Sequence, residues 1–160
     1  MRLLYLFAAF AFLTDQLSKY GALYGLGLSG SGRMEIFPPF LVFIDSLNTG
    51  INFGLFKGAP EAARWGLVGL AVLISLAVAI WAARSFRAGR EFACAGLLIG
   101  GALGNALDRV LQGGVIDFLN MSCCGISNPY VFNLADVWVF AGAIGLAVFT
   151  GGSDPNKAQP

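Results

Sequence analysis

The stretch GGALGNALDRVLQGGVIDF, residues 100–118, decides the fold. It begins as the end of an apolar helix, carries Asn105, Asp108 and Arg109, and breaks at a pair of glycines. It then sets Asp117 among branched and aromatic residues, and a second carboxylate, Asp136, opens the last apolar run of the chain. We expect the fold to bring these two aspartates together at the end of a bundle of membrane helices.

The composition is that of a membrane protein. Of the 160 residues, 57% are hydrophobic and only 12% are charged, which is too apolar for an ordinary soluble domain. The net charge of +1 argues against a nucleic-acid partner, because binding to phosphates needs a basic face. Histidine is absent, so acid–base chemistry must fall to carboxylates.

The chain reads as one domain over residues 1–160 that crosses the membrane four times. Three arginines lie in the short link between the second and third apolar runs, which makes that link cytoplasmic and puts both termini inside. The polar tail, 151–160, has the composition of a disordered segment. The predicted spans cover about 3–26, 64–83, 92–111 and 133–150.

Residues 27–63 do not have the character of a span. The run 40–44 is strand-like, and the asparagines and glycines that follow it punctuate an apolar segment. We expect a small sheet or cradle lying at the outer membrane surface, with a plain connecting loop as the alternative.

Two spacings predict helix contacts. Gly96, Gly100 and Gly104 form a small-residue stripe that lets another helix approach closely. Asp15 and Lys19 are four residues apart, so they share a helix face and can pair. The pair is either a structural ion pair or a support for the site.

Two adjacent carboxylates can share one proton and hydrolyse a peptide without histidine or metal. Asp136 lies in the first turn of a helix, which favours its ionised form, so we expect it to be the base. Asp117 lies among apolar residues, which favours its neutral form and the role of acid. Because the pair titrates as a unit, this assignment of roles is a hypothesis.

Other interpretations of the same residues stay open. Asn133 and Asp136 match a helix capping box, and Asp117 could cap a turn or pair with Arg109. Asn105 could be a packed polar group. In function, the alternative to an enzyme is a small proton- or ion-coupled transporter, although its carboxylates would lie near the midplane. A purely structural membrane protein is a third possibility.

The three cysteines fit neither a disulfide framework nor a zinc site. Cys94 reads as a helix-packing residue, and Cys123 and Cys124 read as part of a loop.

Four motifs, in order, resemble the bacterial lipoprotein signal peptidases (signal peptidase II). They are DQLSK at 15–19, the segment from Asn48 to Phe53, the stretch 100–118, and FNLAD at 132–136. The resemblance covers nearly the whole chain. One departure is Asn52, where the family usually has a small residue.

The resemblance implies an aspartic endopeptidase of the bacterial inner membrane with its active site near the outer face. Its substrate would be a diacylglyceryl-modified prolipoprotein held in membrane lipid, cleaved just before the lipidated cysteine. The implied fold is four transmembrane helices with an extracytoplasmic β-cradle and a short periplasmic helix. No metal and no cofactor are implied, and globomycin-type cyclic peptides would inhibit the enzyme. The implied catalytic residues are Asp117 and Asp136, and the implied supporting residues are Asp15, Lys19, Asn48, Gly50, Gly104, Asn105, Arg109, Asn133 and Ala135.

Overall fold

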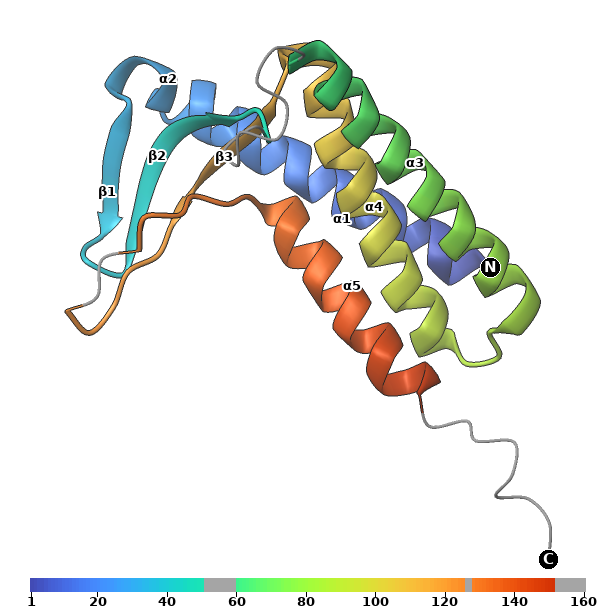
Figure 1. The fold of residues 1–160 in the computed structure, drawn as a ribbon. Coiled ribbons are helices and arrows are strands. Elements are labelled where there is room, and N and C mark those ends of the chain that lie inside the picture. The colour runs from blue at the N-terminus through green and yellow to red at the C-terminus, as the bar shows by residue number, and fades with distance from the viewer. Residues whose placement is uncertain (51–59, 126–127, 152–160) are drawn as a thin grey trace, which may run out of the picture.

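The computed structural model describes residues 1–50, 60–125 and 128–151. Four long helices stand beside a small sheet (Figure 1). In chain order the elements are α1 (Arg2–Tyr20), the π-helical turn η1 (Gly21–Gly25), α2 (Leu28–Ser31), β1 (Arg33–Phe37), β2 (Leu41–Asn48), α3 (Pro60–Ser85), α4 (Gly89–Gln112), β3 (Val115–Asn120) and α5 (Leu134–Thr150).

The four long helices fall where the apolar runs predict them. Helix α4 packs against α1, α3 and α5 and so forms the centre of the bundle. Among the described residues, α3 (over Glu61–Ser85) and α4 are long and apolar enough to cross a membrane, and α5 is a shorter apolar helix. The mostly helical fold class is therefore confirmed.

The glycine stripe of α4 faces α1, as predicted. A Cβ atom added at Gly96 would come within 2.5 Å of the Leu4 carbonyl oxygen, and one at Gly104 within 2.8 Å of Asp15 Oδ2. Gly101 lies on the other side of α4, where a Cβ would come within 2.5 Å of the Ala135 carbonyl oxygen on α5. Small residues thus let α4 approach both neighbours at backbone distance.

The sheet has three antiparallel strands in the order β1-β2-β3. The predicted strand at 40–44 corresponds to β2, which is longer, and the alternative of a plain loop is wrong. Strand β3 was not predicted, and it is the element that carries Asp117, opposite Ser46 of β2. It begins two residues after Gly113, whose φ of 80° ends α4 in the left-handed conformation.

Cys123 and Cys124 lie in the loop after β3, as predicted, but the structure pairs them in a disulfide, which the sequence did not predict. The sequence argument considered cysteines separated along the chain, whereas these two are consecutive, with Cα atoms 3.8 Å apart. Asn52, Phe53 and the tail from 152 lie outside the described residues. Cys94 is free and packs against the core of the bundle, as expected.

Candidate active site

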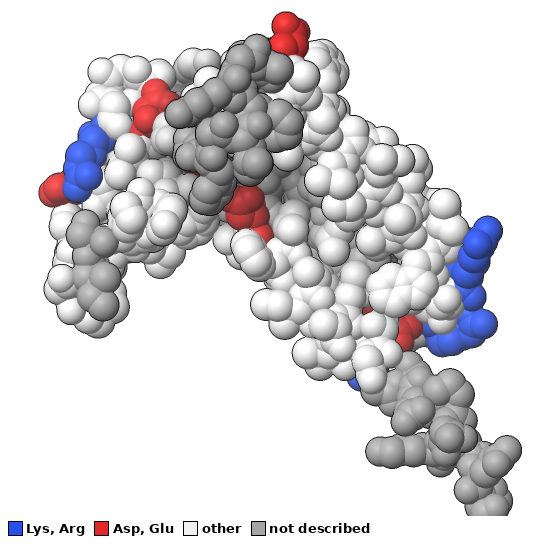
Figure 2. Space-filling view, in the orientation of Figure 1, with Lys and Arg blue, Asp and Glu red and all other residues white. Residues whose placement is uncertain are grey.

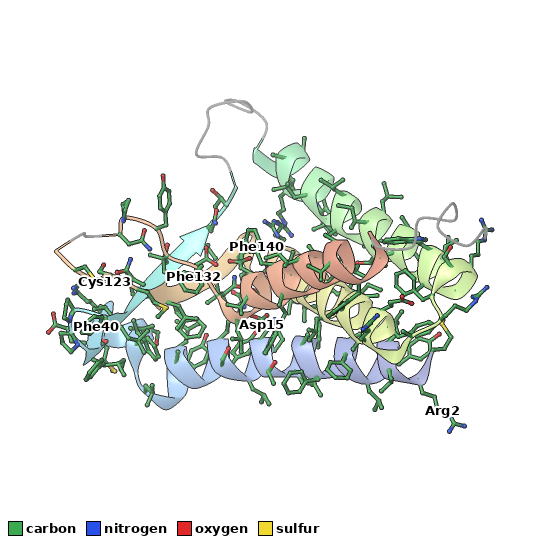
Figure 3. All side chains as sticks on the ribbon, turned by 90° about the horizontal axis from the view of Figure 1, so that it is seen from below. Arg2, Asp15, Phe40, Cys123, Phe132 and Phe140 are labelled. Carbon is green, nitrogen blue, oxygen red and sulfur yellow. A yellow bond between two sulfur atoms is a disulfide. The ribbon has the colours of Figure 1, made fainter. Side chains whose placement is uncertain are left out.

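A buried cluster of three charges joins α1 to α4. Lys19 Nζ lies 2.7 Å from Asp15 Oδ2 and 2.7 Å from Asp108 Oδ2. All three side chains are at most 1% exposed. Asp15 lies on α1, on the side of that helix that faces α5 (Figure 3). The cluster holds two carboxylates and one ammonium, so its formal charge is −1 when all three are ionised.

This cluster also fixes the backbone beside both aspartates of the predicted pair. Asp15 Oδ1 accepts a hydrogen bond of 2.9 Å from the backbone N–H of Ala135, which precedes Asp136. Asp108 Oδ2 accepts one of 3.2 Å from the backbone N–H of Ile116, which precedes Asp117. The ion cluster is therefore the common support of the two chain segments that carry the pair.

Asn105 connects the ion cluster to α5. Its Oδ1 accepts hydrogen bonds from Lys19 Nζ (3.1 Å) and Asn133 Nδ2 (3.0 Å). Its Nδ2 donates to Asp136 Oδ1 at 2.9 Å. Arg109, one turn further along α4, donates from Nη1 to the Asn105 carbonyl oxygen at 3.1 Å.

Asn133 lies between the two aspartates. Its Nδ2 donates to Asp117 Oδ1 at 2.6 Å, and its Oδ1 accepts the backbone N–H of Asp136 at 3.0 Å. Asp136 Oδ2 in turn accepts the backbone N–H of Asn133 at 3.3 Å, which completes the predicted capping box. The capping role and the position between the aspartates therefore coexist in one residue.

Asp117 is nearly fully buried, and its second oxygen is held by Asn48. Asn48 Nδ2 donates to Asp117 Oδ2 at 3.0 Å, while Asn48 Oδ1 accepts the backbone N–H of Gly50 at 2.9 Å. Gly50 has a φ of 74°, a left-handed conformation that favours glycine. The turn after β2 thus orients an amide onto the carboxylate.

Burial raises the pKa of Asp117 from 3.8 to about 6. The hydrogen bond from Asn48 lowers this pKa, the neighbouring Asp136 raises it, and the hydrogen bond from Asn133 lowers it. The loss of hydration outweighs both amide contacts, because it penalises the charged form. The pKa of Asp117 consequently lies closer to neutral pH than that of an ordinary aspartate.

A cleft of about 280 Å³ reaches the site from the side of the helices. Arg109, Asn105 and Asp136 lie among its lining residues, and the rest are apolar side chains of α3, α4 and α5. Acidic atoms reach the surface where the sheet meets the helices (Figure 2). The cleft is thus an apolar groove that includes one member of the aspartate pair.

Arg109 does not pair with Asp117 in the described part of the chain, where the ion pairs involve other residues. Its Nε is buried and has no hydrogen-bond partner there. Arg109 thus brings a positive charge to the lining of the cleft without an ion pair among the described residues.

The structure thus brings every predicted site residue into one connected region. Asp108 and Gln16 belong to it too but were not among the predicted site residues; Gln16 Nε2 donates to Asp108 Oδ1 at 3.0 Å. The signal that could have found Asp108 is a carboxylate inside an apolar helix, which must have a partner. The described residues include no group of three or more acidic or cysteine side chains arranged to hold a metal ion.

Known proteins resemble this chain over most of its length. The family model of signal peptidase (SPase) II matches residues 7–150. The lipoprotein signal peptidase of Methylobacterium sp. (strain 4-46) is 41% identical over 145 residues, which are 89% of this chain and 85% of the relative. That of Rhodopseudomonas palustris (strain ATCC BAA-98 / CGA009) is 38% identical over 139 residues, which are 85% and 84%. A solved structure of a bacterial membrane enzyme, at 1.9 Å resolution, has a TM-score of 0.78 and 26% identity, with 93% of this chain and 92% of that one covered.

Proposed function

The chain belongs to the signal peptidase II family of aspartic-type peptidases, and from that premise we propose that Asp117 and Asp136 are its catalytic pair. Family membership supports the cleavage of signal peptides from lipoproteins, and it favours an enzyme over the transporter considered from the sequence. The observation that carries the assignment of the pair is the position of Asn133, which contacts Asp117 through its side chain and caps the helix turn of Asp136.

The roles of the two carboxylates follow from their surroundings. Asp136, in the first turn of α5, takes a proton from water as the water oxygen adds to the scissile carbonyl carbon. Asp117, protonated because burial raises its pKa, donates its proton to the carbonyl oxygen. When the C–N bond breaks, Asp136 gives its proton to the leaving nitrogen. A hydroxyl of the tetrahedral intermediate returns a proton to Asp117 as the new carboxyl group forms, so the pair again holds one proton.

The supporting residues position this reaction. Asn48 and Asn133 orient Asp117, and Asn105 orients Asp136. Asp15 and Lys19 hold the backbone beneath Ala135, and Gly104 leaves room for the Asp15 carboxylate. The guanidinium of Arg109, which lines the cleft, supplies a donor for a substrate carbonyl oxygen.

The substrate is a diacylglyceryl-modified prolipoprotein, cleaved just before its lipidated cysteine. Its signal helix and lipid stay in the membrane and enter through the apolar cleft between α3, α4 and α5. Members of the family are bacterial inner-membrane proteins. The chain is proposed to form one domain with four spans, both termini in the cytoplasm and the site near the outer face, where globomycin-type peptides would also bind.

Cleavage of a lipidated precursor peptide by purified protein tests the catalytic pair. Asp117→Asn and Asp136→Asn should each abolish the gel shift of the product while the protein still purifies as a folded species. Asp45→Asn, an aspartate exposed on β2, is the matched control and should cleave at the normal rate. Near-normal cleavage by either site variant would remove that aspartate from the mechanism.

A further inference from the structure

The turn between β1 and β2 exposes a set of apolar side chains. Phe37 and Phe40 are 65% and 45% exposed, and their rings stack with centroids 5.7 Å apart. Ile36 beside them is 43% exposed. We call residues 36–40 the hairpin tip. Phe40 lies at the end of the molecule opposite Arg2 (Figure 3).

The loop after β3 extends this apolar surface. Asn120 Nδ2 donates to the Tyr130 carbonyl oxygen at 2.8 Å, which brings Tyr130 back beside the start of the loop. Met121 and Tyr130 are 53% and 76% exposed. A hollow of about 340 Å³ lies between Phe40 and this loop, with Met121 and Cys123 in its lining. Tip and loop therefore form one surface from two distant parts of the chain.

This surface has no charge. Residues 36–44 and 118–132 contain no aspartate, glutamate, lysine or arginine. The nearest charges on the hairpin are Arg33 and Glu35, which pair at 3.7 Å on β1 before the tip is reached. In Figure 2 no blue or red charged residue is visible on the lower part of the sheet. Surfaces that face water normally carry both signs of charge, so this one is unusual for a solvated strand turn.

The hairpin runs back from α2 beside the helix bundle. In Figure 1 the end of the hairpin lies below α2, to one side of the helices. Aromatic side chains with apolar neighbours and no charges are the composition of protein segments at membrane–water interfaces. We propose that the hairpin tip and the adjoining loop insert into the interfacial region of a phospholipid leaflet and anchor the sheet beside the helix bundle.

Photocrosslinking in the full-length chain tests this anchor. The chain is reconstituted in nanodiscs of phosphatidylcholine and phosphatidylglycerol, with p-benzoylphenylalanine in place of Phe37 or of Phe40. After irradiation, intact-mass spectrometry should show phospholipid adducts several-fold above those from the same group at Arg33. Leu73, which is exposed on α3, is the positive control for lipid contact.

Two outcomes overturn the proposal. The first is adduct formation at both tip positions no higher than at Arg33 while Leu73 is labelled. The second is crosslinking of the tip to another copy of the chain in place of lipid, which indicates a protein interface.

A second measurement needs no substitution. Wild-type chain in nanodiscs that contain a phosphatidylcholine with a photoactivatable acyl chain should give adducts that map to residues 36–40. Labelling of α3 without any label on the tip contradicts the anchor. Neither readout depends on peptidase activity, so the result stands apart from the proposed catalytic pair.

Discussion

Asn133 donates a hydrogen bond of 2.6 Å to Asp117 from the N-cap of the helix that carries Asp136. One amide therefore sets the start of α5 and the orientation of a carboxylate on β3. The distance between the two aspartates is governed by a residue whose place is fixed by helix geometry. Changes at this residue can separate the capping function from the positioning function.

Asn133→Ala should lose both functions. Loss of an N-cap costs about 1 kcal/mol of stability, and misplaced catalytic groups lower kcat by roughly 100-fold. Asn133→Ser keeps a capping oxygen but cannot reach Asp117, so it should recover the thermal midpoint without recovering kcat. Thermal unfolding and peptide cleavage measure the two effects. Recovery of kcat in the serine variant would show that the contact with Asp117 is dispensable.

The pH dependence of cleavage should report Asp117. Its pKa is raised from 3.8 to about 6, so the protonated form needed for the acid role is lost as pH rises through about 6. We expect kcat/KM to fall on the alkaline side with a midpoint near that value.

Asn48→Ala should move this alkaline limb to higher pH. The hydrogen bond from Asn48 stabilises the ionised form of Asp117, so its loss raises the pKa further. Ser46→Ala, opposite Asp117 in the sheet, is the control and should leave the midpoint in place. A downward shift in the Asn48 variant contradicts the assignment.

The buried ion cluster makes a prediction about charge balance. Lys19→Met leaves two buried carboxylates unpaired, which should destabilise the fold by about 3–5 kcal/mol. Adding Asp108→Asn to that variant removes one of the excess charges and should recover part of the loss, as a double-mutant cycle in detergent would show. If the double variant is no more stable than Lys19→Met alone, or if the two single losses of stability simply add, the two carboxylates have found other partners.

The glycines of the stripe should be sensitive to substitution, whereas a glycine of α3 without close neighbours should not be. In Gly104→Ala the new Cβ would lie 2.8 Å from Asp15 Oδ2, so Asp15 must move away from Ala135 and cleavage should fall with it. Among the described residues, no atom lies within 4 Å of the Cβ that Gly66→Ala would add on α3. It should be neutral or stabilising by about 0.5–1 kcal/mol, because alanine favours a helix. Similar activity in the two variants would argue against close packing at Asp15.

The sequence predicted the parts of the fold that depend on local patterns. Apolar runs gave the four long helices, and Asn133 with Asp136 gave the helix cap. It did not predict β3, because this segment of four apolar residues, one aspartate and one asparagine becomes a strand only through pairing with β2, some seventy positions earlier. It predicted the pair of Lys19 with Asp15, which are four residues apart, but not that of Lys19 with Asp108. Residues 89 positions apart share no spacing pattern that indicates a contact. The motifs predicted which residues belong to the candidate site. The hydrogen bonds that connect these residues could be seen only in the structure.

The bond from Ala135 to Asp15 spans 120 positions of the chain. During biosynthesis the carboxylate of α1 therefore leaves the ribosome long before the amide that completes its surroundings has been made. A nascent chain released before α5 has neither this contact nor Asp136. If Asp117 and Asp136 act as proposed, the order of translation delays hydrolysis until α5 has packed beside α1.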